Sequence, residues 1–137
     1  MPELLLVGTN FSYPWTGEKM MIFGQDNTGF QEGLGTLFEH LPNKVFKIRR
    51  EQKGPAVYSI QEMTGNTRFR VHIKKNDYMA EKVLDHTDIL FDGTIIWVES
   101  NLFGGGWSNI CEFKFVEGNA KTQNSELNPY LVDVSQL

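Results

Sequence analysis

Strict alternation of apolar and polar residues from Thr67 to Lys74 is the feature that most narrows the fold of this 137-residue chain. Phe69, Val71 and Ile73 fall on one side of an extended strand, and basic side chains fall on the other. A period of two residues is typical of a β-strand that buries one face and exposes the other. We therefore expect antiparallel sheet with one face packed on a core.

Other short apolar runs, bounded by turn residues, predict further strands. They cover residues 4–8, 20–23, 44–51, 57–63, 111–115 and, near the end of the chain, 130–134. The runs at 44–51, 57–63 and 67–74 follow one another with short glycine-containing turns between them. This spacing predicts a three-stranded antiparallel meander.

The pair Asp92-Gly93 lies between two apolar runs, residues 88–91 and 94–98. An Asp-Gly pair in this setting is among the strongest signals for a two-residue hairpin turn. Both faces of the two runs are apolar, which predicts a central hairpin that is covered on both sides. Trp97 is expected in the core.

One helix is predicted over residues 28–41. Its apolar residues recur at the spacing of one helix face and are Phe30, Leu34, Leu37, Phe38 and Leu41. Thr28, with Gln31 three positions later, fits a capping box, and Pro42 ends the helix. Residues 76–86 are assigned to a second, short helix.

These elements predict an α+β fold. It is mainly antiparallel β, a meander or small barrel of about seven to nine strands, with the helix packed on it. We expect residues 1–137 to form a single domain. No apolar run approaches the length of a membrane helix, and the first residues do not resemble a signal peptide. The single cysteine, Cys111, fits a reducing compartment, so a cytoplasmic location without membrane contact is expected.

Catalytic and metal-binding patterns do not occur in the sequence. His40, His72 and His86 are isolated from one another and from cysteine, so no metal site and no cofactor are predicted. Cys111 alternates with Phe113 and Phe115, which places it in the core rather than in a nucleophilic site. No catalytic residue is assigned. The alternative is a small enzyme, or a barrel that binds a phosphorylated or nucleotide ligand in a pocket built from distant segments.

Charge is distributed unevenly along the chain. Residues 44–75 hold nine basic and two acidic residues, a net +7, against four basic and fifteen acidic residues elsewhere, a net −11. In a meander, these cations gather on outward faces, because adjacent strands lie only about 4.8 Å apart. An anionic partner would relieve their mutual repulsion. The alternative is neutralisation by the acidic remainder of the same chain.

We interpret the chain as a non-enzymatic binding or inhibitory module that engages an acidic protein or a nucleic acid. Contact with six or more phosphates predicts about a thousandfold loss of affinity between 50 and 200 mM salt. Trp107, after three glycines, is a candidate anchor in a loop. The predicted partner-binding residues are Lys47, Arg49, Arg50, Arg68, Arg70, His72, Lys74 and Trp107. An accessory protein of a virus or mobile element fits the small size and acidic pI, and an uncovered strand edge could pair two copies as a homodimer.

Overall fold

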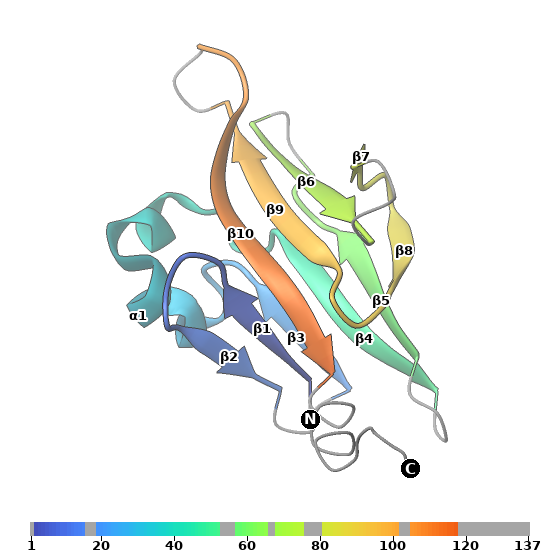
Figure 1. Ribbon diagram of the computed structural model, residues 1–137. Helices are drawn as coiled ribbons and strands as arrows, with labels where there is room; N and C mark the ends of the chain where they lie inside the picture. Colours follow the sequence, from blue (N-terminus) through green and yellow to red (C-terminus); the bar gives the residue numbers. More distant parts are fainter. Residues whose placement is uncertain are drawn as a thin grey trace.

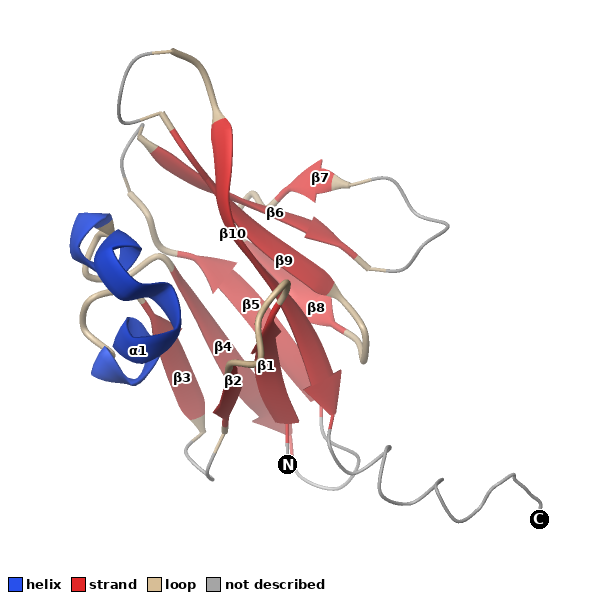
Figure 2. Ribbon diagram, turned by 60° about the vertical axis from the view of Figure 1, so that its left-hand side comes forward, coloured by secondary structure: helices blue, strands red, loops and turns tan. Residues whose placement is uncertain are grey.

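Two antiparallel sheets form most of the computed structural model, which describes residues 2–15, 19–52, 57–65, 68–75, 81–101 and 105–117 (Figure 1). Sheet A contains, in spatial order, β2 (Ser12–Pro14), β1 (Pro2–Leu6), β10 (Ser108–Glu117), β9 (Ile95–Ser100), β6 (Phe69–Lys74) and β7 (Lys82–Val83). Sheet B contains β3 (Met20–Phe23), β4 (Phe46–Gln52), β5 (Val57–Glu62) and β8 (Thr87–Leu90). The predicted α+β class is confirmed, and the two sheets face each other as a sandwich (Figure 2).

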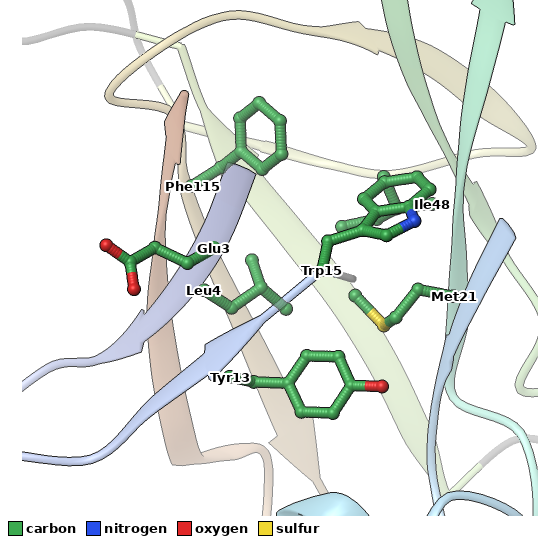
Figure 3. A pocket seen from close by; sticks show the side chains of 7 residues that line it. All are labelled: Glu3, Leu4, Tyr13, Trp15, Met21, Ile48 and Phe115. Carbon is green, nitrogen blue, oxygen red and sulfur yellow. The ribbon is translucent and has the colours of Figure 1, made fainter. Parts of the chain in front are cut away.

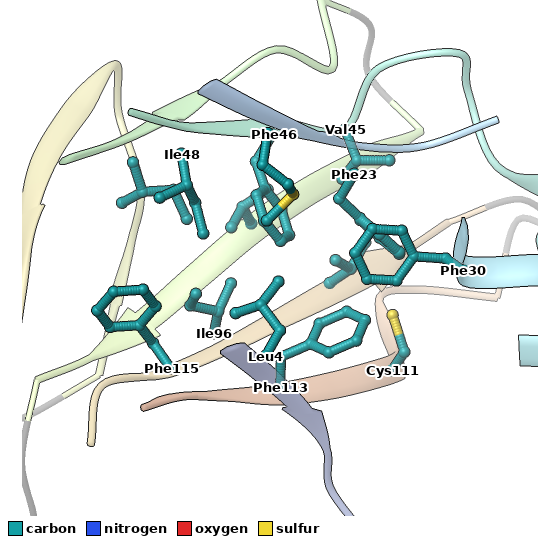
Figure 4. Close-up of a cluster of buried hydrophobic side chains, with 14 of the residues drawn as sticks. Leu4, Phe23, Phe30, Val45, Phe46, Ile48, Ile96, Cys111, Phe113 and Phe115 are labelled. Atoms are coloured by element: carbon teal, nitrogen blue, oxygen red, sulfur yellow. The ribbon is translucent and has the colours of Figure 1, made fainter. Parts of the chain in front are cut away.

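The core between the sheets is built around aromatic rings (Figure 4). Phe113 of β10 in sheet A lies with its ring centroid 5.0 Å from that of Phe23 and 6.4 Å from that of Phe46, both in sheet B. Phe30, from the helical segment, lies 5.7 Å from the same ring. All four rings are fully buried, so one side chain of sheet A joins three structural units.

The helical segment runs from residue 28 to residue 40. It consists of a 3-10 turn at Thr28–Phe30, the short helix α1 at Gln31–Leu34 and a second 3-10 stretch at Gly35–His40. The predicted apolar face is confirmed, because all of its residues are buried or pack against the core. The predicted capping residue is wrong, since Oδ1 of Asn27, rather than Thr28, accepts a hydrogen bond from the backbone N–H of Gly29.

The predicted meander is wrong in its third strand. β4 and β5 pair as expected, but β6 lies in sheet A and pairs with β9 and β7. At the end of β5, the carboxylate of Glu62 accepts hydrogen bonds from the backbone N–H groups of Thr64 (2.7 Å) and Gly65 (3.3 Å). The backbone there bonds to this carboxylate instead of closing a hairpin, and the chain passes to the opposite sheet.

The predicted hairpin at Asp92-Gly93 is also wrong, because the chain passes there from sheet B to sheet A. A turn does form there, with the N–H of Thr94 donating to the carbonyl of Phe91 at 3.0 Å. Among its residues only Gly93 has a positive φ, +90°, whereas a hairpin turn of type I′ requires two. β8 therefore pairs with β5 in sheet B, and β9 enters the centre of sheet A between β10 and β6.

Two further predictions concern the second helix, at residues 76–86, and the last strand. Residues 82–83 form strand β7, not part of a helix. The strand predicted at 130–134 lies outside the described residues.

Within the described ranges, no helix has the length and apolar character needed to cross a lipid bilayer.

A partly buried carboxylate ties the two sheets together at the β7–β8 side. Asp88 of β8 accepts from Nζ of Lys75 at 2.8 Å and from Nζ of Lys82 at 2.6 Å, and both lysines belong to sheet A or its connection. Burial works to raise the pKa of Asp88. The hydrogen bonds from both lysines and from the N–H of Ile89, together with the charge of Lys75, outweigh burial and lower the pKa from 3.8 to about 2.

Replacing Phe113 should test the central role of this ring. We expect Phe113→Ala to lower the free energy of unfolding by about 3–5 kcal/mol, because the cavity would adjoin both sheets and the helical segment. The matched control is Phe91→Ala, since Phe91 is 53% exposed and its removal should cost less than about 0.5 kcal/mol. Urea denaturation followed by circular dichroism measures both, and equal effects would contradict the assignment.

Replacing Asp88 should change the acid dependence of stability. Its pKa is depressed in the folded state, so its stabilising contribution is complete above pH 3.8 and is lost as the pH falls towards about 2. Asp88→Asn should lower the free energy of unfolding by about 1–2 kcal/mol at pH 7 and remove this part of the acid dependence. Asp85→Asn is the control because the Asp85 side chain is 98% exposed. Parallel pH profiles for the wild type and Asp88→Asn would refute the proposed role.

Candidate functional site

The predicted basic patch is divided between opposite faces of the sandwich. Lys47 and Arg49 alternate with the buried residues Phe46 and Ile48 on β4, so they lie on the outer face of sheet B. Arg50 lies at the bulged end of the same strand. Arg70, His72 and Lys74 lie on the outer face of sheet A, on β6, and Arg68 is exposed just before that strand. The prediction of a single basic surface is therefore wrong, because β4 and β6 do not share a sheet.

Part of the positive charge is neutralised within the chain, as the alternative interpretation expected. The N···O distances are 2.7 Å for Lys44–Asp26, 3.9 Å for Arg49–Glu51, 2.7 Å for Arg70–Glu99 and 2.8 Å for Lys75–Asp88. The two exposed pairs, Lys44–Asp26 and Arg49–Glu51, stabilise the fold by only about 0–1 kcal/mol each. Their effect on recognition is larger, since they reduce the charge offered to a partner.

On the outer face of sheet A, charged and aromatic side chains from β6, β9 and the start of β10 form one cluster. We call it the aromatic–cation cluster, and it consists of Arg70, His72, Trp97, Glu99 and Trp107. Strand register brings four of these residues together, because Arg70 pairs with Glu99 and His72 pairs with Trp97 across β6 and β9. Three of the predicted partner-binding residues thus meet here: Arg70, His72 and Trp107.

Glu99 provides one oxygen for two basic side chains. Its Oε1 lies 2.7 Å from Nε of Arg70 and 3.0 Å from Nε2 of His72. The contact with Arg70 is a hydrogen bond, whereas the contact with His72 is short but not aligned as one. His72 is 10% exposed at its side chain, and Glu81 approaches its Nδ1 only to 3.9 Å. Among the described residues, its two buried ring nitrogens have no hydrogen-bond partner.

Two stacked pairs order the cluster. The ring of His72 lies over that of Trp97, with centroids 5.4 Å apart and planes inclined by 15°. The guanidinium carbon of Arg70 lies 4.2 Å from the ring centroid of Trp107, a cation–π contact. Trp97 is 8% exposed, whereas Trp107 is 36% exposed. The first pair is a buried support, and the second pair meets solvent.

Trp97 is buried as expected but on the opposite side of the sheet from the core. Ile96 and Val98 point between the sheets, so Trp97 and Glu99 point outward. Sequence analysis missed Glu99 and misplaced Trp97. The period-two alternation within residues 95–100 could have predicted that both side chains point outward. No pattern in these residues indicates that β6 is the neighbouring strand.

The backbone before Trp107 is shaped by glycine. Gly106 has a φ of +103°, a conformation that other residues rarely adopt. Its N–H donates to Oδ1 of Asn101 at 3.3 Å, and the N–H of Asn101 donates to the carbonyl of Arg68 at 2.8 Å. These bonds join the start of β10 to the ends of β9 and β6, where residues 105–107 extend beyond the other strands (Figure 1).

Elsewhere the described residues offer little catalytic chemistry. The hollow between β1, β2, β3, β4 and β10 has no room for a water molecule, and it is lined by Glu3, Leu4, Tyr13, Trp15, Met21, Ile48 and Phe115 (Figure 3). Cys111 is in the core as predicted, and burial raises its pKa to about 12, so its thiol stays protonated. No group of three metal-binding side chains occurs among the described residues.

Quenching of tryptophan fluorescence should distinguish the three indoles. Trp107 is the most exposed of them, whereas Trp15 and Trp97 are 5% and 8% exposed. We expect Trp107→Phe to remove most of the emission that acrylamide quenches, and Trp97→Phe to leave it in place. Equal quenching of the two variants would contradict the position of Trp107 in the cluster.

The aromatic–cation cluster is thus a partly exposed arginine and indole held by a partly buried carboxylate, a buried histidine and a second, buried indole. Comparison of the chain with protein-family models, with curated proteins and with solved structures finds no match.

Proposed function

We propose that the protein is a non-enzymatic binding module that recognises an acidic protein partner through the aromatic–cation cluster. The observation that carries the proposal is the exposed Trp107 ring lying on the guanidinium of Arg70. Tryptophan and arginine are the residues most enriched among those that dominate protein–protein binding energy. Their position at one end of the sandwich makes them accessible to a large partner.

The support beneath this pair favours binding without rearrangement. Arg70 lies on β6, next to the central strand β9, and Glu99 holds its Nε at 2.7 Å. His72 and Trp97 fill the adjacent row of the same two strands. A side chain that is already ordered loses less conformational entropy on binding. The cluster is therefore suited to act as a preformed contact.

Three of the four edge strands, β2, β3 and β8, favour binding through this face rather than by strand addition. Pro14 on edge strand β2 has no N–H to donate. On edge strand β8, the N–H of Ile89 donates to its neighbour Asp88 at 2.7 Å. On edge strand β3, the carbonyl of Ile22 accepts from Nδ2 of Asn27 at 2.8 Å. Occupied edge groups hinder pairing with another chain, so these edges give no support to a homodimer formed by strand pairing.

Charge distribution favours a protein over a nucleic acid. Of the predicted basic patch, sheet B holds Lys47, Arg49 and Arg50, and Glu51 lies 3.9 Å from Arg49. On sheet A, Arg70 is paired with Glu99. A face with three phosphate contacts would lose only about 40-fold in affinity between 50 and 200 mM salt. Such a surface is too weakly charged for a dedicated nucleic-acid site.

A pull-down with a site variant tests the proposal. The tagged protein should capture a protein from lysate of its source after nuclease treatment, and Trp107→Ala should reduce that capture about tenfold or more. Lys47→Ala and Arg49→Ala form the control, because these residues lie on the opposite face. Loss of the bound material on nuclease treatment would identify a nucleic acid instead. Undiminished capture by the Trp107 variant would overturn the proposed surface.

A further inference from the structure

Arg70 uses only part of its hydrogen-bonding capacity within the protein. A guanidinium carries five N–H donors, and here Nε donates to Glu99. Within the described residues, neither Nη group of Arg70 has an acceptor. The side chain is 36% exposed, so these donors are accessible to a partner. An arginine held through Nε alone keeps its two Nη groups as a fork for a planar anion.

Trp107 restricts the orientation of this fork. Its ring lies against the guanidinium at 4.2 Å, so the face of the guanidinium is covered while its donor edge is not. No hydrogen bond engages the indole N–H within the described residues. The exposed part of the ring provides an apolar surface directly beside the fork. A ligand that fits both has a planar anionic end and an adjacent methylene group.

The surrounding charges favour a ligand with one negative charge. Glu99 contacts Arg70, Glu81 lies 3.9 Å from His72, and Glu112 pairs with Trp97 from the β10 side. A phosphate dianion would be repelled by these carboxylates. Lys74, on the same face of β6, has no ion-pair partner among the described residues and adds one positive charge. A carboxylate matches this balance better than a phosphate does.

We infer that Arg70 and Trp107 form a recognition site for an aspartate or glutamate side chain of the partner, an inference that rests on the proposed function. The two Nη groups of Arg70 bind the carboxylate oxygens, and the methylene carbon of the ligand packs on the Trp107 ring. Glu99 acts as an internal competitor, because it occupies Nε and lowers the positive potential at the fork. Nε2 of His72 lies 3.0 Å from the same Glu99 oxygen, beside this contact.

This arrangement predicts opposite effects for two substitutions. Arg70→Gln removes the fork and should weaken binding of a carboxylate about tenfold. Glu99→Gln keeps the shape and an acceptor oxygen for Nε but removes the competing charge, so it should strengthen the same binding severalfold. Arg70→Lys keeps the charge without the planar fork and should give an intermediate affinity. Lys114→Gln, on the outer face of sheet A but outside the cluster, is the matched control.

The probes are a twelve-residue peptide of alternating glycine and aspartate, the matching peptide with asparagine, and inorganic phosphate. Each is titrated into the full chain while tryptophan fluorescence is recorded, and circular dichroism checks that every variant is folded. We expect saturable binding of the aspartate peptide, weaker binding of the other two probes, and the order Glu99→Gln, wild type, Arg70→Lys, Arg70→Gln in affinity.

Equal affinity of Arg70→Gln and the wild type for the aspartate peptide would overturn the inference, as would a preference for phosphate. The two proposals fail separately. If Arg70→Gln still captures the lysate partner and Trp107→Ala does not, the binding surface stands and the carboxylate site is wrong. If capture does not depend on Trp107, the proposed function itself is wrong.

Discussion

The packing of Phe113 against Phe23, Phe30 and Phe46 is the constraint on which the rest of the structure depends. Because the four rings come from sheet A, sheet B and the helical segment, neither sheet has a complete core without the other. Burial of one phenylalanine side chain contributes roughly 1.5–3 kcal/mol, so this cluster is a large part of the marginal stability of a chain of this size. It also requires each sheet to turn its apolar face inward.

That requirement determines where the polar side chains lie. In the strands that cross the core, alternate residues point away from it, on sheet A in one direction and on sheet B in the opposite direction. The basic residues of 44–75 are therefore distributed over two outer faces. On sheet A, the acidic and aromatic residues of β9 meet those of β6, and this meeting creates the aromatic–cation cluster. The site is a product of strand pairing as much as of composition.

Local patterns predicted much of the fold. The strand at residues 20–23 follows from a short apolar run, and the apolar face of the helical segment and the alternation in β6 and β10 follow from side-chain period; all were found as expected. Sheet membership was not predictable, because Glu62 and Gly93 direct the chain between layers through hydrogen bonds and a φ value that the sequence does not display. Arg70, His72 and Trp107 were identified as binding candidates from the sequence. Glu99 was missed, because its contact with Arg70 depends on the pairing of β9 with β6.

The division between inner and outer side chains has an evolutionary consequence. Residues on the outer face of sheet A take no part in the phenylalanine core, so substitutions at positions 70, 99 and 107 can alter the chemistry of this face while leaving the packing between the layers intact. Descendants of such a sequence can change the surface of this face faster than they change shape. A chain built in this way can diverge rapidly on one face while its architecture persists.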